Sequence, residues 1–129
     1  MSRKEIGYCL KNGFVPHYDG VCEYSGFPHA PTANTIKRRG KVCILNFNID
    51  YVSGHYITST AKIIVPEECR PKTGFNFPVH YDYYLAGNVA SHGIGNALIK
   101  TNGEITLVPA VFALGNVYAI NFSNLAYEI

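Results

Sequence analysis

Residues 56–71 of the chain read YITSTAKIIVPEECRP, and this stretch predicts a β-strand that stops at a proline. Four of its apolar residues share one parity, namely Ile57, Ala61, Ile63 and Val65. Threonine and lysine occupy the other parity, which is the pattern of a strand with one buried face. Pro66 has no backbone donor, so a central strand cannot continue through it. We therefore expect a strand followed by a stiff, charged corner.

The same alternation predicts strands over residues 42–49, 75–79 and 116–127. In the first of these, Cys43, Leu45, Phe47 and Ile49 point to one side. In the last, Tyr118, Ile120 and Phe122 share a face. Between them, residues 81–96 predict a strand fragment and then a long exposed loop, because glycines and asparagines interrupt the pattern.

Residues 98–108 form the clearest hairpin signal. Asn102 and Gly103 both tolerate positive φ, as a two-residue type I′ turn requires. That turn would place Leu98 opposite Leu107, and Lys100 opposite Ile105.

About seven short strands, turn signals between them and no helical periodicity favour an all-β fold, an antiparallel β-sandwich of jelly-roll type. Residues 36–129 would form this sandwich. Residues 1–35 predict an irregular N-terminal arm with short strands and a brief helix over residues 3–10. With 129 residues, the two parts make one domain.

Composition excludes several classes of function. A hydrophobic fraction of 47% against 16% charged residues indicates a folded chain. A net charge of +2 does not predict a nucleic-acid partner, and we interpret residues 37–39 (KRR) as a solvated edge or turn. Neither a signal peptide nor an apolar run long enough for membrane insertion is predicted.

The cysteine pattern predicts free thiols. The four cysteines, Cys9, Cys22, Cys43 and Cys69, contain no CxxC pair, although three disulfide pairings are possible on paper. We expect synthesis in a reducing cytoplasm, where thiols stay reduced. Glu67 and Glu68 beside Cys69 would raise its pKa and oppose a nucleophilic thiolate.

The histidines and carboxylates do not predict an enzyme. Five histidines occur without an HxH or HxxxH spacing, so we predict neither a metal nor a cofactor. The more informative stretch is HYDYY, residues 80–84, followed by a glycine-rich run. Tyrosine, aspartate and asparagine suit sugar recognition, whereas alternate tyrosines also fill cores and subunit interfaces. The candidate glycan-binding residues are Tyr81, Asp82, Tyr83, Asn88, His92 and Asn96.

Several predicted strands carry apolar residues on both faces, for example Ile99 and Val108 opposite the Leu98 and Leu107 face. A domain of this size has one core, so the second apolar set needs another cover. A symmetric contact between copies of the chain would provide it.

Three passages resemble the C-terminal receptor-binding or fibre-tip domain of bacteriophage tail-fibre and baseplate proteins. Residues 12–14 (NGF) with Tyr18 are similar to that family's opening NGW segment. Residues 36–45 are similar to its strand of the form Y-R-K-x-G-x-V-x-L, and residues 64–71 to its L-P-x-G-Y-R-P corner, with Glu68 and Cys69 in place of Gly and Tyr. Residues 99–107 match its hairpin.

The resemblance implies a homotrimeric β-sandwich at a virion tip, next to other tail or fibre proteins, that adsorbs to a bacterial surface saccharide without catalysis. Two alternatives stay open. One is an architectural virion subunit, in the fibre or as a decoration, without a ligand. The other is a small polysaccharide hydrolase, for which nine acidic residues offer few paired carboxylates.

Overall fold

Nine β-strands form one antiparallel sheet in the computed structural model, which describes residues 17–107, 112 and 115–129. The elements are β1 (His17–Gly20), β2 (Glu23–Ser25), β3 (Ala33–Arg39), β4 (Val42–Ile49), β5 (Lys62–Ile64), the 3₁₀ turn η1 (Glu67–Cys69), β6 (Phe75–Leu85), β7 (Val89–Ile99), β8 (Glu104–Leu107) and β9 (Asn116–Glu128). The predicted all-β, antiparallel class is confirmed. Within the described residues, no helix has the length and apolar character needed to cross a membrane.

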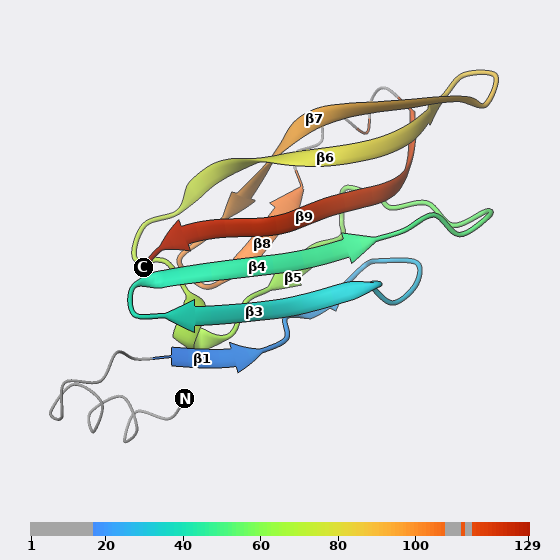
Figure 1. Ribbon diagram of the computed structural model, residues 1–129. Coiled ribbons are helices and arrows are strands. Elements are labelled where there is room, and N and C mark those ends of the chain that lie inside the picture. Colours follow the sequence, from blue (N-terminus) through green and yellow to red (C-terminus); the bar gives the residue numbers. More distant parts are fainter. Residues whose placement is uncertain (1–16, 108–111, 113–114) are drawn as a thin grey trace, which may run out of the picture.

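The sheet curls until its two edges approach each other. Its strand order is β1-β3-β4-β9-β6-β7-β8-β5-β2, so β1 and β2 lie at opposite edges. Only Val21 and Cys22 separate these two strands in sequence, and the three Cα steps between them span at most about 11 Å. The curl places β8 and β5 behind β4 and β9 (Figure 1), and the core fills the space between the two layers.

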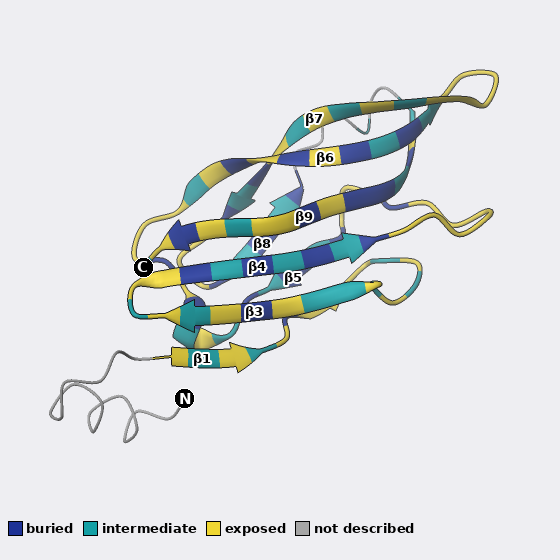
Figure 2. Cartoon of the chain, in the orientation of Figure 1, coloured by how far each residue is buried: buried dark blue, intermediate teal, exposed yellow. Residues whose placement is uncertain are grey.

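The buried face of β4 is the one predicted from its alternation. Cys43, Leu45, Phe47 and Ile49 are fully buried, while the residues between them are partly exposed. Figure 2 shows the same alternation along β6, and in β9 the alternation changes parity between Ala119 and Ile120, which are both buried. The shared inner face packs rings from three strands, since Phe47 of β4 contacts Phe122 of β9, which in turn contacts Phe77 of β6.

The strand before Pro66 is shorter than the alternating stretch, residues 57–65, from which it was predicted. Only Lys62–Ile64 forms β5, because a turn closed by Ala61 N–H and the Thr58 carbonyl (3.0 Å) interrupts the chain. Ile57 makes a separate bridge to Val117. The predicted buried parity is nevertheless confirmed throughout. The strand also ends before Pro66, and η1 forms the corner.

The hairpin between β7 and β8 has a register one residue away from the predicted one. Ile99 lies opposite Ile105, and the Lys100 amide donates to the Glu104 carbonyl at 2.9 Å. The predicted type I′ turn needs positive φ at two residues, but only Gly103 has it, at 87°. The loop therefore has three residues. A one-residue shift exchanges the faces of a strand, so Ile99 and Ile105 enter the core and Leu98 does not.

The predicted end of a strand near His80 and the loop conformation over residues 87–96 are both wrong, whereas the predicted exposure is confirmed, since none of residues 87–96 is buried. β6 continues to Leu85, and β7 pairs with it along its whole length. The glycine run stays extended because Gly95 accommodates the Tyr81 ring: a Cβ at Gly95 would lie 2.6 Å from Tyr81 Cε2. Glycine under a cross-strand aromatic ring is a known device of sheets.

Tyr118 does not share the Ile120 and Phe122 face, contrary to expectation. The pairing of β6 with β9 changes register between Asp82 and Tyr83, so Tyr118 is the additional residue of a bulge. Its side chain is therefore directed out of the core and contacts other tyrosines on the outer side of the sheet.

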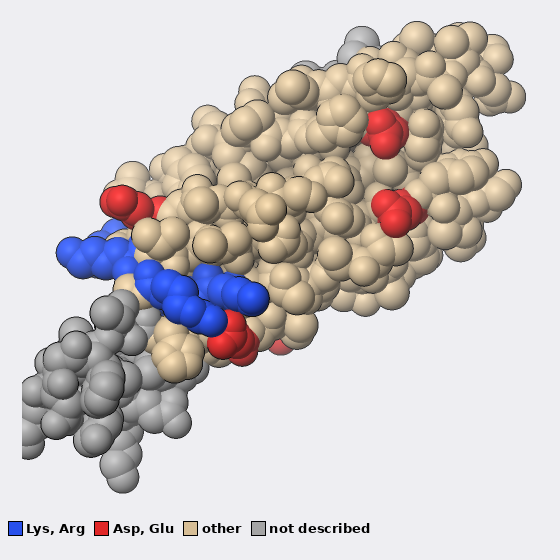
Figure 3. All heavy atoms as spheres, viewed as in Figure 1, with Lys and Arg blue, Asp and Glu red and all other residues tan. Residues whose placement is uncertain are grey.

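The basic run lies in β3, with Lys37 and Arg39 exposed on one face and Arg38 half-buried on the other. Arg39 forms an ion pair with Asp19 of β1 at 3.0 Å, and Arg38 donates to the Glu68 carbonyl at 2.9 Å. These contacts agree with a solvated edge. In the view of Figure 3, Lys and Arg side chains gather at one end of the molecule.

The predicted helix over residues 3–10, the 12–14 segment, Cys9 and Val108 lie outside the described residues.

Candidate functional site

Three segments meet at the end of the molecule opposite the basic run, and we call them the loop end: residues 50–56, 86–88 and 115–118. The turn between β6 and β7 and the loop between β4 and β5 extend from this end in Figure 1. Large apolar side chains are exposed here, namely Tyr51, Val52, Tyr56, Leu85 and Val89. Exposed apolar groups gathered at one place mark an interaction surface.

Three tyrosine rings contact one another at the loop end and form the tyrosine cluster: Tyr51, Tyr84 and Tyr118. The ring centroids of Tyr84 and Tyr118 are 4.5 Å apart, and those of Tyr51 and Tyr118 are 5.1 Å apart with planes at 79°. The β9 bulge directs Tyr118 to this side, while Tyr84 has the outward parity of β6. The cluster therefore presents ring surfaces and hydroxyl groups on the outside of the sheet.

The hydroxyls of Tyr84 and Tyr118 stay protonated at neutral pH, because their surroundings raise the pKa of each. Hydrogen bonding with Tyr51 is the main cause that raises the pKa of Tyr84. Partial burial, followed by the charge of Asp82, raises the pKa of Tyr118. A neutral phenol can both donate and accept a hydrogen bond, so the cluster can bind hydroxyl-rich ligands.

An open pocket of about 480 Å³ lies beside the tyrosine cluster. It is lined by Tyr84, Leu85, Ala86, Gly87, Asn88, Phe112, Gly115 and Asn116. The turn that forms one wall has positive φ at Gly87 (80°) and Asn88 (59°). Gly115 is tightly packed, since a Cβ there would collide with the Tyr84 carbonyl oxygen. The amides of Asn88, in the β6–β7 turn, and of Asn116 in β9 thus line a cavity that also has two aromatic residues, Tyr84 and Phe112.

Polar side chains continue from the cluster along the outer face of β6 and β7. His80 Nε2 lies 3.3 Å from an Asp82 carboxylate oxygen, and the His80 and His92 rings are stacked at 6.0 Å. Asp82 is directly opposite His92, and Asn96 is opposite Pro78 further along the strands. This row joins the pocket to the middle of the sheet.

The six residues predicted for a glycan site separate into three groups. Tyr81 and Tyr83 are buried, and the Tyr81 hydroxyl donates to the Asn96 carbonyl at 3.1 Å, so neither ring is available at the surface. Burial also raises the pKa of Tyr81 to about 12. Asp82, His92 and Asn96 lie on the outer face, whereas Asn88 lines the pocket.

Sequence reasoning missed Tyr51, Tyr84 and Tyr118. Tyr84 could have been found, because it has the same parity as His80 and Asp82 in a continuous strand. Tyr118 had no local signal, since its outward direction depends on a bulge against β6. Tyr51 lies in a loop, where periodicity says nothing about direction.

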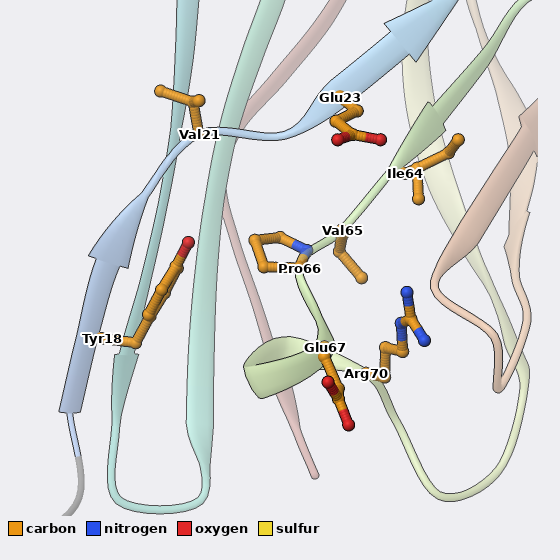
Figure 4. Close-up of a pocket in the computed structure, with 8 residues that line it drawn as sticks. All are labelled: Tyr18, Val21, Glu23, Ile64, Val65, Pro66, Glu67 and Arg70. Carbon is orange, nitrogen blue, oxygen red and sulfur yellow. The ribbon is translucent and has the colours of Figure 1, made fainter. Parts of the chain in front are cut away.

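A second pocket, of about 340 Å³, lies where the two sheet edges approach at the predicted corner. Its walls include Tyr18 of β1, Glu23 of β2, and Pro66, Glu67 and Arg70. Figure 4 shows Glu23 and Glu67 on opposite sides of Pro66.

The thiols of Cys22, Cys43 and Cys69 are free and buried. A hydrogen bond with Cys43, together with burial, raises the pKa of Cys69 well above its usual range. A protonated, inaccessible thiol is a poor nucleophile. Across the described part of the chain, no three or more His, Cys, Asp or Glu side chains are grouped to hold a metal ion.

Comparisons with known proteins found no matching family model, no matching curated protein and no matching solved structure.

Proposed function

We propose that the protein is a non-enzymatic structural and adhesion module of a bacteriophage virion that binds a bacterial surface glycan through its loop end. The observation that carries the binding proposal is the tyrosine cluster beside a pocket lined by Asn88 and Asn116. The assignment to a tail-fibre or baseplate tip follows from the motif resemblance. Neighbouring tail or fibre proteins would then hold the module on the virion.

The chemistry of the loop end suits a saccharide. A sugar ring has an apolar face of C–H groups that packs on an aromatic ring, and the rings of Tyr84 and Tyr118 are held in place by each other. Amides and neutral phenols provide donors and acceptors for sugar hydroxyls. Asp82 provides an acceptor beside Tyr118.

The sharpest test is Asn88→Gly. Glycine keeps the positive φ of this turn, so the substitution removes the amide from the pocket without straining the backbone. We expect at least a tenfold weaker binding to host cells or to the glycan identified on an array. Asn124→Gly is the matched control, because Asn124 is also exposed with positive φ (52°) but lies outside the pocket.

Tyr118→Ala tests the aromatic part of the site. It removes one ring of the cluster and should reduce binding at least tenfold while the far-ultraviolet circular dichroism spectrum stays unchanged. Binding that survives both Asn88→Gly and Tyr118→Ala in folded protein would remove the loop end as the glycan site.

We propose that the chain assembles as a homotrimer. Apolar residues remain exposed on the outer side, including Ile94 of β7 (77% exposed) and Val89 (57%), and a contact between copies would cover them. Multi-angle light scattering should give three times the mass of one chain. A single-chain mass at working concentration would contradict the trimer.

The same exposed apolar residues favour a second candidate, a purely architectural virion subunit. In that case Val89 and Ile94 would contact neighbouring virion proteins and the loop end would have no ligand. A folded trimer that gives no signal on a glycan array and does not bind host cells would support this second candidate over the first.

A further inference from the structure

Two histidines that are far apart in sequence face each other at the loop end. His29 lies between β2 and β3, and His55 lies between β4 and β5, 26 residues later. Their Nδ1 atoms are 3.4 Å apart, and their ring centroids are 5.5 Å apart. Neither histidine lines the pocket or belongs to the tyrosine cluster.

A backbone contact fixes the protonation pattern of one ring. His29 Nε2 lies 2.8 Å from the Asp50 carbonyl oxygen, which can only accept a hydrogen bond, so Nε2 carries the proton. In neutral His29 the lone pair is therefore on Nδ1, directed toward His55. A hydrogen bond from the second nitrogen to a carbonyl is the usual support of a metal-binding imidazole.

The separation of the two nitrogen atoms matches a shared metal ion. With Zn–N bonds of 2.0–2.1 Å and a tetrahedral angle, two imidazole nitrogens on one Zn²⁺ are about 3.3 to 3.4 Å apart. We propose that His29 and His55 form a surface site for a divalent transition metal such as Zn²⁺, with water in the remaining coordination positions. Imidazole ligands select such metals over Ca²⁺ and Mg²⁺, which prefer oxygen.

Binding requires a change of tautomer in one ring. Without metal, His55 donates its Nδ1 proton to His29 Nδ1 across the 3.4 Å contact. When the metal binds, His55 carries its proton on Nε2 instead, and both Nδ1 lone pairs are directed to the ion. A tetrahedral ion lies off the Nδ1–Nδ1 line, so each ring must turn by roughly 35° for its lone pair to meet the ion. His55 is exposed and His29 is half-buried in a loop.

A second pair of histidines provides a matched control. His80 and His92 have ring centroids 6.0 Å apart, but their rings are stacked and His80 Nε2 is directed to Asp82. His80 Nε2 is thus turned toward a carboxylate and not toward a nitrogen of His92, and among the described residues His80, Asp82 and His92 are not grouped to hold a metal ion. The protein thus contains one histidine pair suited to share a metal and one that is not.

The test is a Zn²⁺ titration of the full chain with ¹⁵N-labelled histidine, read by nuclear magnetic resonance. We expect the Nδ1 signals of His29 and His55 to shift together at one equivalent of metal, while those of His80 and His92 stay in place. By isothermal titration calorimetry, His29→Ala and His55→Ala should each weaken this binding at least tenfold. His92→Ala should leave it unchanged, and Mg²⁺ should produce no shift.

Three results would overturn the site. The first is a wild-type titration without any shift of the two Nδ1 signals at millimolar Zn²⁺. The second is Zn²⁺ affinity that survives in both His29→Ala and His55→Ala. The third is a shift confined to His80 and His92. Because His29 and His55 are in surface loops, the variants should fold normally, and unchanged circular dichroism spectra would verify that.

Discussion

Two tyrosines of the same strand show how differently the two ends of the molecule use one residue type. Tyr127 lies near the C-terminal end of β9, at what we call the corner end (residues 40–41, 66–71 and 127–129), and is only 6% exposed. Its hydroxyl donates to the Cys69 carbonyl at 2.6 Å. Tyr118 leaves the same sheet at a bulge and joins the exposed tyrosine cluster.

At the corner end, polar side chains donate hydrogen bonds to backbone carbonyl groups. The Arg38 guanidinium donates to the Glu68 carbonyl and Tyr127 to that of Cys69, so η1 is fixed to β3 and β9. At the loop end, the amides of Asn88 and Asn116 and the rings of the tyrosine cluster lie at the surface instead. Polar groups whose hydrogen bonds are satisfied within the protein thus stabilise the fold at the corner end. Polar groups that face solvent at the loop end are available to bind a ligand.

The largest expected effect would test this contrast directly. Tyr127→Ala should lower the free energy of unfolding by about 3–5 kcal/mol, because it creates a cavity in the core and leaves a buried carbonyl without its donor. Urea unfolding followed by circular dichroism would measure it. If Tyr127→Ala lowered the free energy of unfolding no more than an alanine substitution of an exposed tyrosine, the two ends would not differ in their contribution to stability.

Alkaline pH should sharpen the comparison. Burial raises the pKa of Cys22 to about 12 and that of Tyr81 to about 12, and it also raises that of Tyr127. The folded protein keeps these protons while the unfolded chain releases them, from about pH 9 for the thiol and pH 10 for the tyrosines. Stability is therefore full below pH 9 and falls toward pH 12, by up to about 1.4 kcal/mol per pH unit for each group.

The control for this pH dependence uses the two tyrosines again. Tyr127→Phe should flatten the loss of stability between pH 10 and 12, measured by urea unfolding at each pH. Tyr118→Phe should flatten this loss much less, since the Tyr118 ring is only partly buried. Equal slopes for wild type and Tyr127→Phe would show that this buried phenol is not responsible.

A pair of glycines in β7 gives a third, smaller effect. Gly95→Ala should cost about 1–3 kcal/mol, because the new methyl group overlaps the buried Tyr81 ring. Gly93→Ala is the matched control, since its nearest neighbour, the Tyr83 hydroxyl, would be 3.7 Å from the Cβ, an ordinary contact. Thermal unfolding of both variants measures the difference. Equal melting temperatures of the two variants would mean that the Tyr81 ring can be packed beside a methyl group at position 95.

The smallest effect on stability is expected for the tyrosine cluster. Tyr118→Ala should change the free energy of unfolding by less than about 1 kcal/mol, because its ring packs on exposed neighbours and not in the core. Urea unfolding beside Tyr127→Ala provides the comparison. A loss of several kcal/mol would identify the cluster as part of the structural core and would weaken its assignment as a binding surface.

The fold was more predictable than the candidate site, for a physical reason. Burial of Cys43, Leu45, Phe47 and Ile49 follows from alternation, because side chains of one strand alternate between core and solvent whatever its partners are. The site depends on which strands are adjacent and on their register. Of the six predicted residues, Asn88 lines the pocket, whereas Tyr81 and Tyr83 fill the core.

By itself the sequence determined the all-β class, the buried parity of β4 and the stretch before Pro66, and the end of that stretch at the proline. These features depend on local steric and hydrophobic rules that a short segment already obeys. Only the tertiary structure decided the one-residue shift of the β7–β8 hairpin, the outward turn of Tyr118 and the meeting of His29 with His55. Each of these depends on pairing between distant segments, because a single residue of register moves a side chain from one face of a sheet to the other.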